Sequence, residues 1–281
     1  MKKTAVLEGG GLRGTFSAWV LENLLERGYF LDHIIGVSAG ACIAASYSSR
    51  QRGRNWRVNV QMPSSPRYVG LRNYLLTGSF FNMQYIFEEI PNNLDPFDEE
   101  TFYASPEEFE TGVTSRETGE MVYFNKEKLR KHGFCRVLMA SSSIPFLSKP
   151  VEIDGTYYYD GGVGESIPVG HAVKSHEKVL VILTRPRGYR KKPVRFERLV
   201  RMKYRKHPAF ADAMLNRWKQ YNASLDLVNR LEGEGRAFVI APEGEYIVKR
   251  MERDTERLGS LFRHGYASMD GRFEELVSFF G

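Results

Sequence analysis

The pattern of hydrophobic and polar positions predicts a chain that begins with two strands separated by a helix. Residues 4–7 and 33–37 are short apolar runs typical of buried strands, and residues 15–27 carry apolar side chains at helical spacing. Gly28 ends that helix, and a helix of small residues at 39–49 follows the second strand. Two strands joined in this way indicate a parallel βαβ unit with a right-handed crossover.

The rest of the chain continues the same mixture of strands and helices. Residues 108–124 predict two antiparallel strands, and residues 151–162 predict a hairpin that turns at Asp154-Gly155. Residues 135–145 predict a buried helix that Pro145 stops. The other expected elements are strands at 178–184 and 236–242, an amphipathic helix at 214–231 and a helical tail at 252–280. Residues 50–106 carry turn signals and short aromatic-rich helical pieces, and the chain has no internal repeat. These patterns predict a single α/β domain.

Composition excludes several classes of protein. The 281 residues are 42% hydrophobic, which is enough for a sizeable core, and no run approaches the ~20 apolar residues that span a bilayer. The apolar run after Lys2 and Lys3 reaches only to Glu8, which is too short for a secretory signal. We expect Cys42 and Cys135 to be free buried thiols, and no Cys/His cluster has metal-ligand spacing. A cytoplasmic protein without metal or cofactor is expected.

The positive charge is concentrated in one segment. The net charge is +6, yet residues 185–206 alone hold eleven Lys or Arg and one acid, so the remainder is slightly acidic. Within this segment Phe196, Leu199, Val200 and Tyr204 recur at helical spacing. Such a basic amphipathic helix either lies on an anionic membrane or packs its apolar stripe on the core. No recognised motif supports nucleic-acid binding.

A serine lies between two glycines at the end of the second strand. Gly36, Ser38 and Gly40 form a G-x-S-x-G pattern that runs from an apolar strand into a small-residue helix. This context is typical of the nucleophile elbow of serine hydrolases, in which a sharp turn exposes the hydroxyl. The alternative is a serine that merely caps the helix after an ordinary turn.

A glycine loop follows the first strand. Gly9, Gly11 and Gly14 also fit the dinucleotide-binding fingerprint, but the acid that this fold needs, Asp32, precedes the second strand instead of ending it. A phosphate-binding P-loop would need Gly-Lys-Ser/Thr, which is absent. Because both loops leave the carboxyl ends of parallel strands, the glycine N–H groups can form an oxyanion hole beside Ser38.

The serine needs a group that accepts its proton. Asp160 ends an aromatic strand and is followed by Gly161 and Gly162, although an aspartate that only shapes a turn would look the same. The order Ser38, Asp160, His171 also matches the chain order of a hydrolase triad. His171 lies in an expected surface helix, however, where a solvated or capping role is favoured.

Together these motifs resemble the patatin-like phospholipases, in particular the bacterial patatin-like acyl hydrolases. The motifs are GGGLRG at 9–14, GVSAG at 36–40 and DGG at 160–162, in the family order; ASSSIP at 140–145 and Pro168 are further similarities. The resemblance covers most of residues 4–185 and continues weakly to the end. It implies a three-layer α/β/α fold with a mostly parallel central sheet, and a single hydrolase domain over 1–281 with residues 186–281 packed on the core.

The resemblance also implies roles for individual residues. Ser38 is the expected nucleophile and Asp160 its partner in a dyad without histidine, and Glu8 stands in a structural position where many members have Asp. The backbone around Gly10, Gly11 and Leu12 is the expected oxyanion hole. The full expected site comprises the glycine loop Gly9, Gly10, Gly11, Leu12, Arg13 and Gly14, the elbow glycines Gly36 and Gly40, and the third-motif glycines Gly161 and Gly162.

The implied activity is hydrolysis of acyl-lipid esters through an acyl-enzyme, by a phospholipase, lysophospholipase or carboxylesterase. Residues 60–105 are expected to cover the acyl groove. The alternative is a catalytically weak or inactive protein of the same fold that binds membrane surfaces through residues 185–206. In either case we expect a cytoplasmic protein, with peripheral contact to the inner face of an anionic membrane and no nucleic-acid partner.

Overall fold

A central, mostly parallel sheet organises the computed structural model, which describes residues 2–244 and 248–281. In the described residues the sheet has eight strands in the order β5-β6-β3-β2-β1-β7-β8, and β4 pairs with β3. The strands are β1 (Thr4–Leu7), β2 (His33–Val37), β3 (Glu108–Ser115), β4 (Met121–Asn125), β5 (Val151–Ile153), β6 (Thr156–Asp160), β7 (Val179–Ile182) and β8 (Ala237–Ile240). Pairs among β3, β2, β1, β7 and β8 are parallel, and the pairs of β3 with β4 and β6 are antiparallel.

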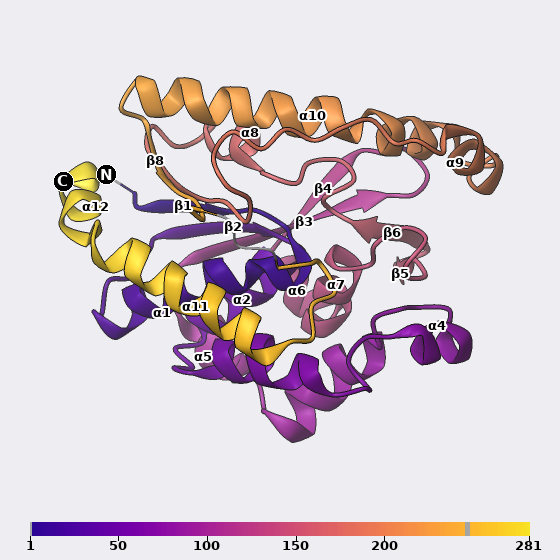
Figure 1. Cartoon of the computed structure of the whole chain (residues 1–281), viewed down its shortest axis with the longest axis horizontal. Coiled ribbons are helices and arrows are strands. Elements are labelled where there is room, and N and C mark those ends of the chain that lie inside the picture. The colour runs from indigo at the N-terminus through magenta and orange to yellow at the C-terminus, as the bar shows by residue number, and fades with distance from the viewer. Residues whose placement is uncertain (1, 245–247) are drawn as a thin grey trace.

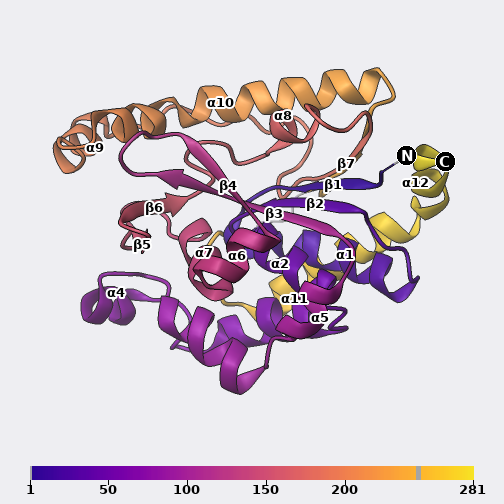
Figure 2. The same ribbon diagram turned by 180° about the vertical axis from the view of Figure 1, so that it is seen from behind.

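Helices cover both faces of the sheet and form three layers (Figures 1 and 2). Helices α8, α9 and α10 cover one face, and α1, α2, α7 and α11 cover the other. The helices are α1 (Thr15–Glu26), α2 (Ala39–Ser48), α3 (Arg54–Trp56), α4 (Leu71–Thr77), α5 (Glu99–Ala104), α6 (Lys126–His132), α7 (Phe134–Ser141), α8 (Val169–Ala172), α9 (Glu197–Lys203), α10 (Pro208–Gly233), α11 (Thr255–Asp270) and α12 (Phe273–Phe280). The predicted three-layer α/β/α fold is thus confirmed.

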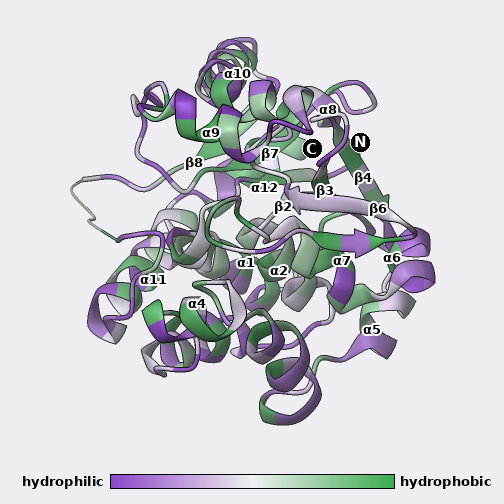
Figure 3. Ribbon diagram, turned by 90° about the vertical axis from the view of Figure 1, so that its right-hand side faces the viewer, coloured by the Kyte–Doolittle hydropathy of each residue, from purple (hydrophilic) through white to green (hydrophobic). Residues whose placement is uncertain are grey.

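Side chains of β1 alternate between the two layers because successive residues of a strand point to opposite faces. Val6 packs in the cluster that contains Tyr221 and Val228 of α10. Ala5 and Leu7 belong to the larger cluster beneath α1 and α2. The sheet is therefore buried on both faces, and strand β7 and the edge strand β8 are green, and so hydrophobic, in Figure 3.

Strand β3 continues past the end of β2, and the strand β6 pairs with this extension, so β6 ends beside β2. Val37, the last residue of β2, pairs with Gly112, and β3 continues for three residues beyond that point. Strand β6 pairs antiparallel with this extension, with Asp160 opposite Val113. The end of β6 therefore lies next to the end of β2, although the two strands run in opposite directions.

The structure departs from the sequence predictions mainly in residues 50–106. Two segments there are π-helical, η2 (Arg57–Gln61) and η4 (Tyr85–Leu94), and a 3₁₀ helix, η3 (Met62–Ser64), follows the first. The predicted buried helix α7 ends at Ser141, four residues before Pro145, which was expected to stop it. Cys42 and Cys135 are free thiols, as predicted, but both residues are partly buried and not fully buried as expected.

The C-terminal helix α11 packs closely on α1. A Cβ atom built on Gly265 of α11 would lie 2.3 Å from the carbonyl oxygen of Phe16, so this contact has no room for a methyl group. Gly265 is buried, and Phe16 follows the glycine loop directly. The glycine at position 265 thus lets α11 support the helix that begins at the candidate site.

We predict that Gly265→Ala lowers the free energy of unfolding by about 1–3 kcal/mol, because the added methyl group forces α11 away from α1. Urea unfolding monitored by circular dichroism measures the effect. Gly233→Ala is the matched control, since nothing lies within 4 Å of a Cβ atom there and Ala favours the helix by about 0.5–1 kcal/mol. Equal stability of the two variants would contradict the prediction.

Candidate active site

Three loops meet at the edge of the sheet where β1 and β2 end. β1 leads into the glycine loop, whose 3₁₀ turn η1 (Gly11–Gly14) precedes α1. β2 leads into Ser38, and β6 ends at Asp160. The chain passes from β1 to β2 on one side, whereas it passes from the adjacent strand β7 to β8 on the other side. The connections after β1 and β7 therefore leave in opposite directions, and such a position is where open α/β sheets bind ligands.

Ser38 occupies a strained backbone conformation, with φ 56° and ψ −127°. Its amide N–H donates to Ser141 Oγ at 2.9 Å, and Ser141 Oγ donates to the Gly112 carbonyl at 2.7 Å. The turn also needs close backbone approach: a Cβ atom on Gly40 would lie 2.8 Å from the Leu7 carbonyl oxygen. Strain of this kind at an elbow projects the side chain from the sheet edge.

Ser38 Oγ donates a hydrogen bond to Asp160 Oδ2 at 2.8 Å. The other carboxylate oxygen, Oδ1, accepts from the Gly162 amide at 2.7 Å, so the carboxylate is held on both sides. The two residues are only 5% and 7% exposed. Gly161 fits tightly over β3, since a Cβ atom there would lie 2.3 Å from the Gly112 carbonyl oxygen.

The glycine loop lies beside this pair and leaves two amide groups open. The Gly9 amide donates to the Ser166 carbonyl at 3.1 Å, and the Leu12 amide donates to the Arg250 carbonyl at 3.0 Å. The Leu12 amide is thus not free to act as the oxyanion donor that the sequence suggested. In the described part of the chain the amides of Gly10 and Gly11 have no acceptor.

Glu8, Arg13 and Gly14 surround the loop. The buried Glu8 carboxylate accepts from the Thr184 amide at 2.6 Å and from the Tyr221 hydroxyl at 2.8 Å, which ties the end of β1 to α10. The pKa of Arg13 is lowered to about 10, mainly because the side chain is buried and to a lesser extent because Arg185 and Arg250 repel its charge. Gly14 lies against α2, where a Cβ atom would come 2.9 Å from Ile43.

His171 lies away from the serine. Its Nε2 atom is 2.7 Å from Glu110 Oε2, and its ring stacks on Tyr123 with centroids 3.8 Å apart. The structure therefore does not assemble the triad that the chain order allowed.

An apolar pocket opens at Ser38 and extends between α2, α7 and η4. It encloses about 920 Å³, counting its open mouth. Its walls include Leu12, Cys42, Tyr68, Phe81, Ile86, Phe87, Ile90, Phe134, Leu138 and Ile144. Residues between 68 and 97 supply part of this wall, and that residues 60–105 cover an acyl groove stays a prediction. Burial raises the pKa of Cys42 to about 11, so this wall thiol is uncharged at neutral pH.

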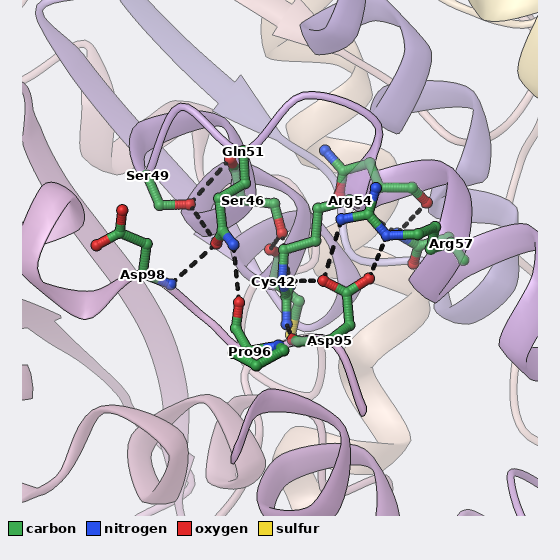
Figure 4. A network of polar contacts seen from close by, with 11 residues as sticks. Cys42, Ser46, Ser49, Gln51, Arg54, Arg57, Asp95, Pro96 and Asp98 are labelled. Atoms are coloured by element: carbon green, nitrogen blue, oxygen red, sulfur yellow. Dashed lines mark hydrogen bonds and ion pairs between the residues drawn. The ribbon is translucent and has the colours of Figure 1, made fainter. Parts of the chain in front are cut away.

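A charged network closes the pocket at the wall formed by Ser46 and Arg54 (Figure 4). Arg54 donates to Ser46 Oγ at 2.9 Å, and its Nε lies 3.6 Å from Asp95 Oδ1. Asp95 also accepts two hydrogen bonds from Arg57, at 2.5 and 3.1 Å. The guanidinium of Arg54, itself buried, is paired there, and this pairing limits the cost of placing a charge beside an apolar pocket.

Sequence reasoning missed three residues at this site. Ser141 lies within the ASSSIP segment, but nothing in the sequence says that it holds the Ser38 amide. Arg217 of α10 and Arg250 line a second pocket together with Ser38 and Asp160. Their position depends on packing between distant segments, and both lie outside the basic segment 185–206, so no sequence pattern indicated them. Among described residues, no group of three His, Cys, Asp or Glu side chains could hold a metal ion, and no helix could span a membrane.

Comparison with known proteins identifies the family. The patatin-like phospholipase family matches residues 5–173, and the chain belongs to that family. A domain of unknown function, DUF6363, matches residues 207–281.

Two curated relatives each match 63% of the chain. The uncharacterized protein YjjU of Escherichia coli (strain K12) is 27% identical over 190 residues, which cover 63% of this chain and 50% of that protein. The probable lipid hydrolase 463L of Invertebrate iridescent virus 6 is 23% identical over 205 residues, which cover 63% of this chain and 65% of that protein. The match thus spans less than two thirds of either relative. The crystal structure of VipD from Legionella pneumophila matches with a TM-score of 0.45 and 14% identity, covering 96% of this chain and 67% of that one.

The lowered pKa of Glu110 predicts that its contribution to the free energy of unfolding decreases in acid. Hydrogen bonding to His171, and to a lesser extent to His33, lowers the pKa of Glu110 to about 2. A carboxylate whose pKa is lowered by folding stabilises the protein above its unfolded pKa of ~4.3, and this stabilisation disappears as the pH falls towards 2. We expect Glu110→Gln to be less stable than the wild type at pH 5 and the difference to shrink by pH 3.

Urea unfolding at the two pH values measures this difference. Glu120→Gln removes an exposed carboxylate from the turn before β4 and serves as the control, with a difference that is small at both pH values. If Glu110→Gln lowers the free energy of unfolding as much at pH 3 as at pH 5, the lowered pKa of Glu110 is not the cause of the stabilisation.

Proposed function

We propose that the protein is a serine-dependent lipid acyl hydrolase that cleaves carboxylic esters through a Ser38–Asp160 dyad. The observation that carries this proposal is the 2.8 Å contact between Ser38 Oγ and Asp160 Oδ2 at the mouth of an apolar pocket. Membership of the patatin-like phospholipase family and the similarity to a probable lipid hydrolase support the same activity.

In the first half of the reaction Ser38 Oγ attacks the ester carbonyl while its proton passes to Asp160 Oδ2. Negative charge develops on the carbonyl oxygen, and the open amides of Gly10 and Gly11 stabilise it. The intermediate then breaks its bond to the alcohol, which leaves with the proton from Asp160. The products of this half are a free alcohol and an acyl group on Ser38.

In the second half water attacks the acyl-enzyme and gives its proton to Asp160. Collapse releases the fatty acid, and the proton returns to Ser38 Oγ. A carboxylate is a weak base at neutral pH, so its position matters more than its basicity. The Gly162 amide supplies that position by holding Oδ1 at 2.7 Å, which leaves Oδ2 directed at the serine.

The apolar pocket is the proposed site for the acyl chain. It begins at Ser38 and is lined mainly by aliphatic and aromatic side chains, which favour burial of a hydrocarbon chain at about 25 cal/mol per Å². We therefore place the fatty acyl group there and the alcohol on the opposite side of Ser38.

We further propose peripheral contact with anionic membranes, with a cytoplasmic location at the inner face. Val200 of α9 and Tyr204, which follows the helix, are buried. Phe196, Leu199 and Met202 are 53%, 45% and 65% exposed. Helix α4 exposes further leucines and lies on the same side of the molecule (Figures 1 and 2). Ion pairs engage part of the basic segment, namely Arg187 with Glu232, Arg190 with Asp226, and Arg201 with Glu197 and Asp212. Arg198 and Arg205 remain exposed and carry no ion pair within the described residues.

Mutation of the dyad tests the hydrolase proposal. With p-nitrophenyl esters we expect Ser38→Ala to lower kcat/KM by at least about a thousandfold and Asp160→Asn by about a hundredfold or more. His171→Ala should stay within about threefold of the wild type, because His171 bonds to Glu110 and not to the serine. Loss of activity in His171→Ala together with full activity in Asp160→Asn would disprove the dyad, and reaction of Ser38 with a fluorophosphonate probe gives an independent readout.

Vesicle cosedimentation tests the membrane contact. We expect the Arg198→Gln/Arg205→Gln variant to bind phosphatidylglycerol vesicles about 30-fold more weakly, since each removed charge contributes about 1 kcal/mol. Lys174→Gln/Arg230→Gln removes the same charge away from α9 and should bind as the wild type does. Equal wild-type binding to phosphatidylcholine vesicles, or no effect of added salt, would count against the proposal.

A further inference from the structure

We propose that the apolar pocket contains a polar subsite, formed by Arg54 and Ser46, that binds a hydroxyl group carried by the acyl chain far from its ester carbonyl. This inference rests on the proposed function and specifies the acyl group of the substrate. The chain has about ten carbons and a hydroxyl at its far end, as the length of α2 between Ser38 and Ser46 indicates. Arg54 is then a specificity-determining residue that contacts the substrate about two helical turns away from the dyad.

The pocket follows one face of α2 away from Ser38. Ala39, Cys42 and Ser46 are three or four residues apart on this helix, and all of them line the pocket. A helix rises about 1.5 Å per residue, so Ser46 lies roughly 12 Å along the axis from Ser38. An extended chain of about ten carbons spans a similar distance, because its zigzag bonds are about 1.5 Å long. The end of such an acyl chain, bound at Ser38, therefore reaches Ser46.

Arg54 is the only charged side chain among the described residues that line this pocket. Its Nη1 donates to Ser46 Oγ at 2.9 Å, and its Nη2 donates to the Asp95 carbonyl at 3.3 Å (Figure 4). Its Cζ atom also lies 5.2 Å from the centre of the Phe97 ring, which lines the same pocket. These contacts hold the guanidinium at the pocket wall beside Ser46.

The guanidinium of Arg54 retains donors that no group in the described residues accepts. A guanidinium has five N–H groups, and the hydrogen bonds to Ser46 and to the Asp95 carbonyl use two of them. The Nε atom is buried without a hydrogen-bond partner. A buried donor that lacks an acceptor destabilises the protein, and an oxygen atom of a bound ligand removes that cost. The pocket wall thus offers hydrogen bonds to its occupant.

The carboxylate that pairs with Arg54 is already engaged by a second guanidinium. Asp95 Oδ2 and Oδ1 accept from Arg57 at 2.5 and 3.1 Å. Arg54 Nε lies 3.6 Å from Asp95 Oδ1, which is too long for a hydrogen bond. Two guanidinium groups thus share one carboxylate, and the network as a whole is positively charged. A positively charged donor forms a stronger hydrogen bond to an oxygen acceptor than a neutral donor does.

A hydroxyl group fits this subsite better than an alkyl end or a carboxylate. An alkyl end leaves the Arg54 donors without an acceptor, and a carboxylate has to move a full charge from water into a pocket walled by apolar side chains. A hydroxyl oxygen accepts from Arg54 without that cost. Ser46 Oγ accepts one hydrogen bond from Arg54 and donates to the Cys42 carbonyl at 3.4 Å, so it retains a lone pair for the hydroxyl proton.

Kinetics with p-nitrophenyl esters of three ten-carbon acids test the inference. The acyl groups are decanoate, 10-hydroxydecanoate and 6-hydroxydecanoate, each used at concentrations at which the ester is monomeric. We expect the wild type to have a kcat/KM at least about fivefold higher for the 10-hydroxy ester than for decanoate, because the terminal hydroxyl reaches Arg54. The 6-hydroxy ester should react at least about fivefold more slowly than decanoate, because its hydroxyl lies unpaired against apolar walls.

This comparison needs no variant of the protein. A wild type that prefers decanoate to the 10-hydroxy ester would overturn the inference. Equal rates for the two hydroxylated esters would overturn the position of the subsite.

Substitution of Arg54 assigns the preference to its guanidinium. Arg54→Met retains an unbranched side chain and should lower the ratio of kcat/KM for the 10-hydroxy ester to that for decanoate by at least about twentyfold. Arg54→Lys, which keeps the charge with fewer donors, should give an intermediate ratio. Arg57→Gln is the matched control, because it removes the other guanidinium of the network, which does not line the pocket, and should leave the ratio within about twofold of the wild type. Circular dichroism confirms that each variant is folded, and an unchanged ratio in Arg54→Met would contradict the assignment.

Calorimetry on the Ser38→Ala variant tests binding without turnover. We expect methyl 10-hydroxydecanoate to bind at least about fivefold more tightly than methyl decanoate, and Arg54→Met in this background to abolish the difference. Equal affinity of Ser38→Ala for the two esters would show that the pocket has no polar subsite. If the wild type hydrolyses none of the esters, the proposed function fails, whereas this binding result still decides whether the pocket recognises a hydroxylated chain.

Discussion

The hydrogen bond between Ser38 and Asp160 depends on the register of three strands. β3 extends three residues beyond the end of β2, and β6 pairs with that extension so that Asp160 lies opposite Val113. Shifting β6 by one residue would turn the Asp160 side chain to the other face of the sheet. The close fit of Gly161 over the Gly112 carbonyl opposes such a shift, and Ser141 fixes the serine from the other side by accepting its amide. The site is thus a consequence of sheet geometry more than of any single loop.

The surroundings of Ser38 differ on its two sides, and this difference favours one orientation of a bound ester. One side is an apolar pocket walled by α2, α7 and η4, and the charged Arg54–Asp95 pair lies in its wall. The other side is bordered by Arg217 and Arg250. A lipid ester has the same polarity, with a hydrocarbon acyl chain on one side of the carbonyl and a polar alcohol on the other. Under the proposed function, only one orientation of the substrate satisfies both pockets, and it directs the carbonyl oxygen to the glycine loop.

Sequence reasoning predicted the parts of this site that are local in the chain. Strand–turn–helix patterns located β1, β2 and the elbow, and the D-G turn located the hairpin that ends at Asp160. It predicted short helical pieces within residues 50–106, but it did not predict that η2 and η4 are π-helical. It assigned the Leu12 amide to the oxyanion hole, whereas Arg250, more than 200 residues away, accepts that hydrogen bond. Contacts of that kind leave no periodic signal, so the apolar and cationic walls emerged only from the folded structure.

The last third of the chain contacts the glycine loop and α1 and belongs to the same sheet as β1. Family matches divide the chain at residues 173 and 207, yet β8 from the second region pairs with β7 in the same sheet. Tyr221 of α10 holds Glu8 at the base of the glycine loop, and the Arg250 carbonyl holds the loop at Leu12. Helix α11 rests on α1 through Gly265, directly after the same loop. Removing residues 207–281 would leave a buried carboxylate, an amide donor and one face of α1 without their partners, each at a cost of about 1–3 kcal/mol or more. We therefore propose that residues 1–281 act as one hydrolase domain, in which the C-terminal region supports the glycine loop beside Ser38.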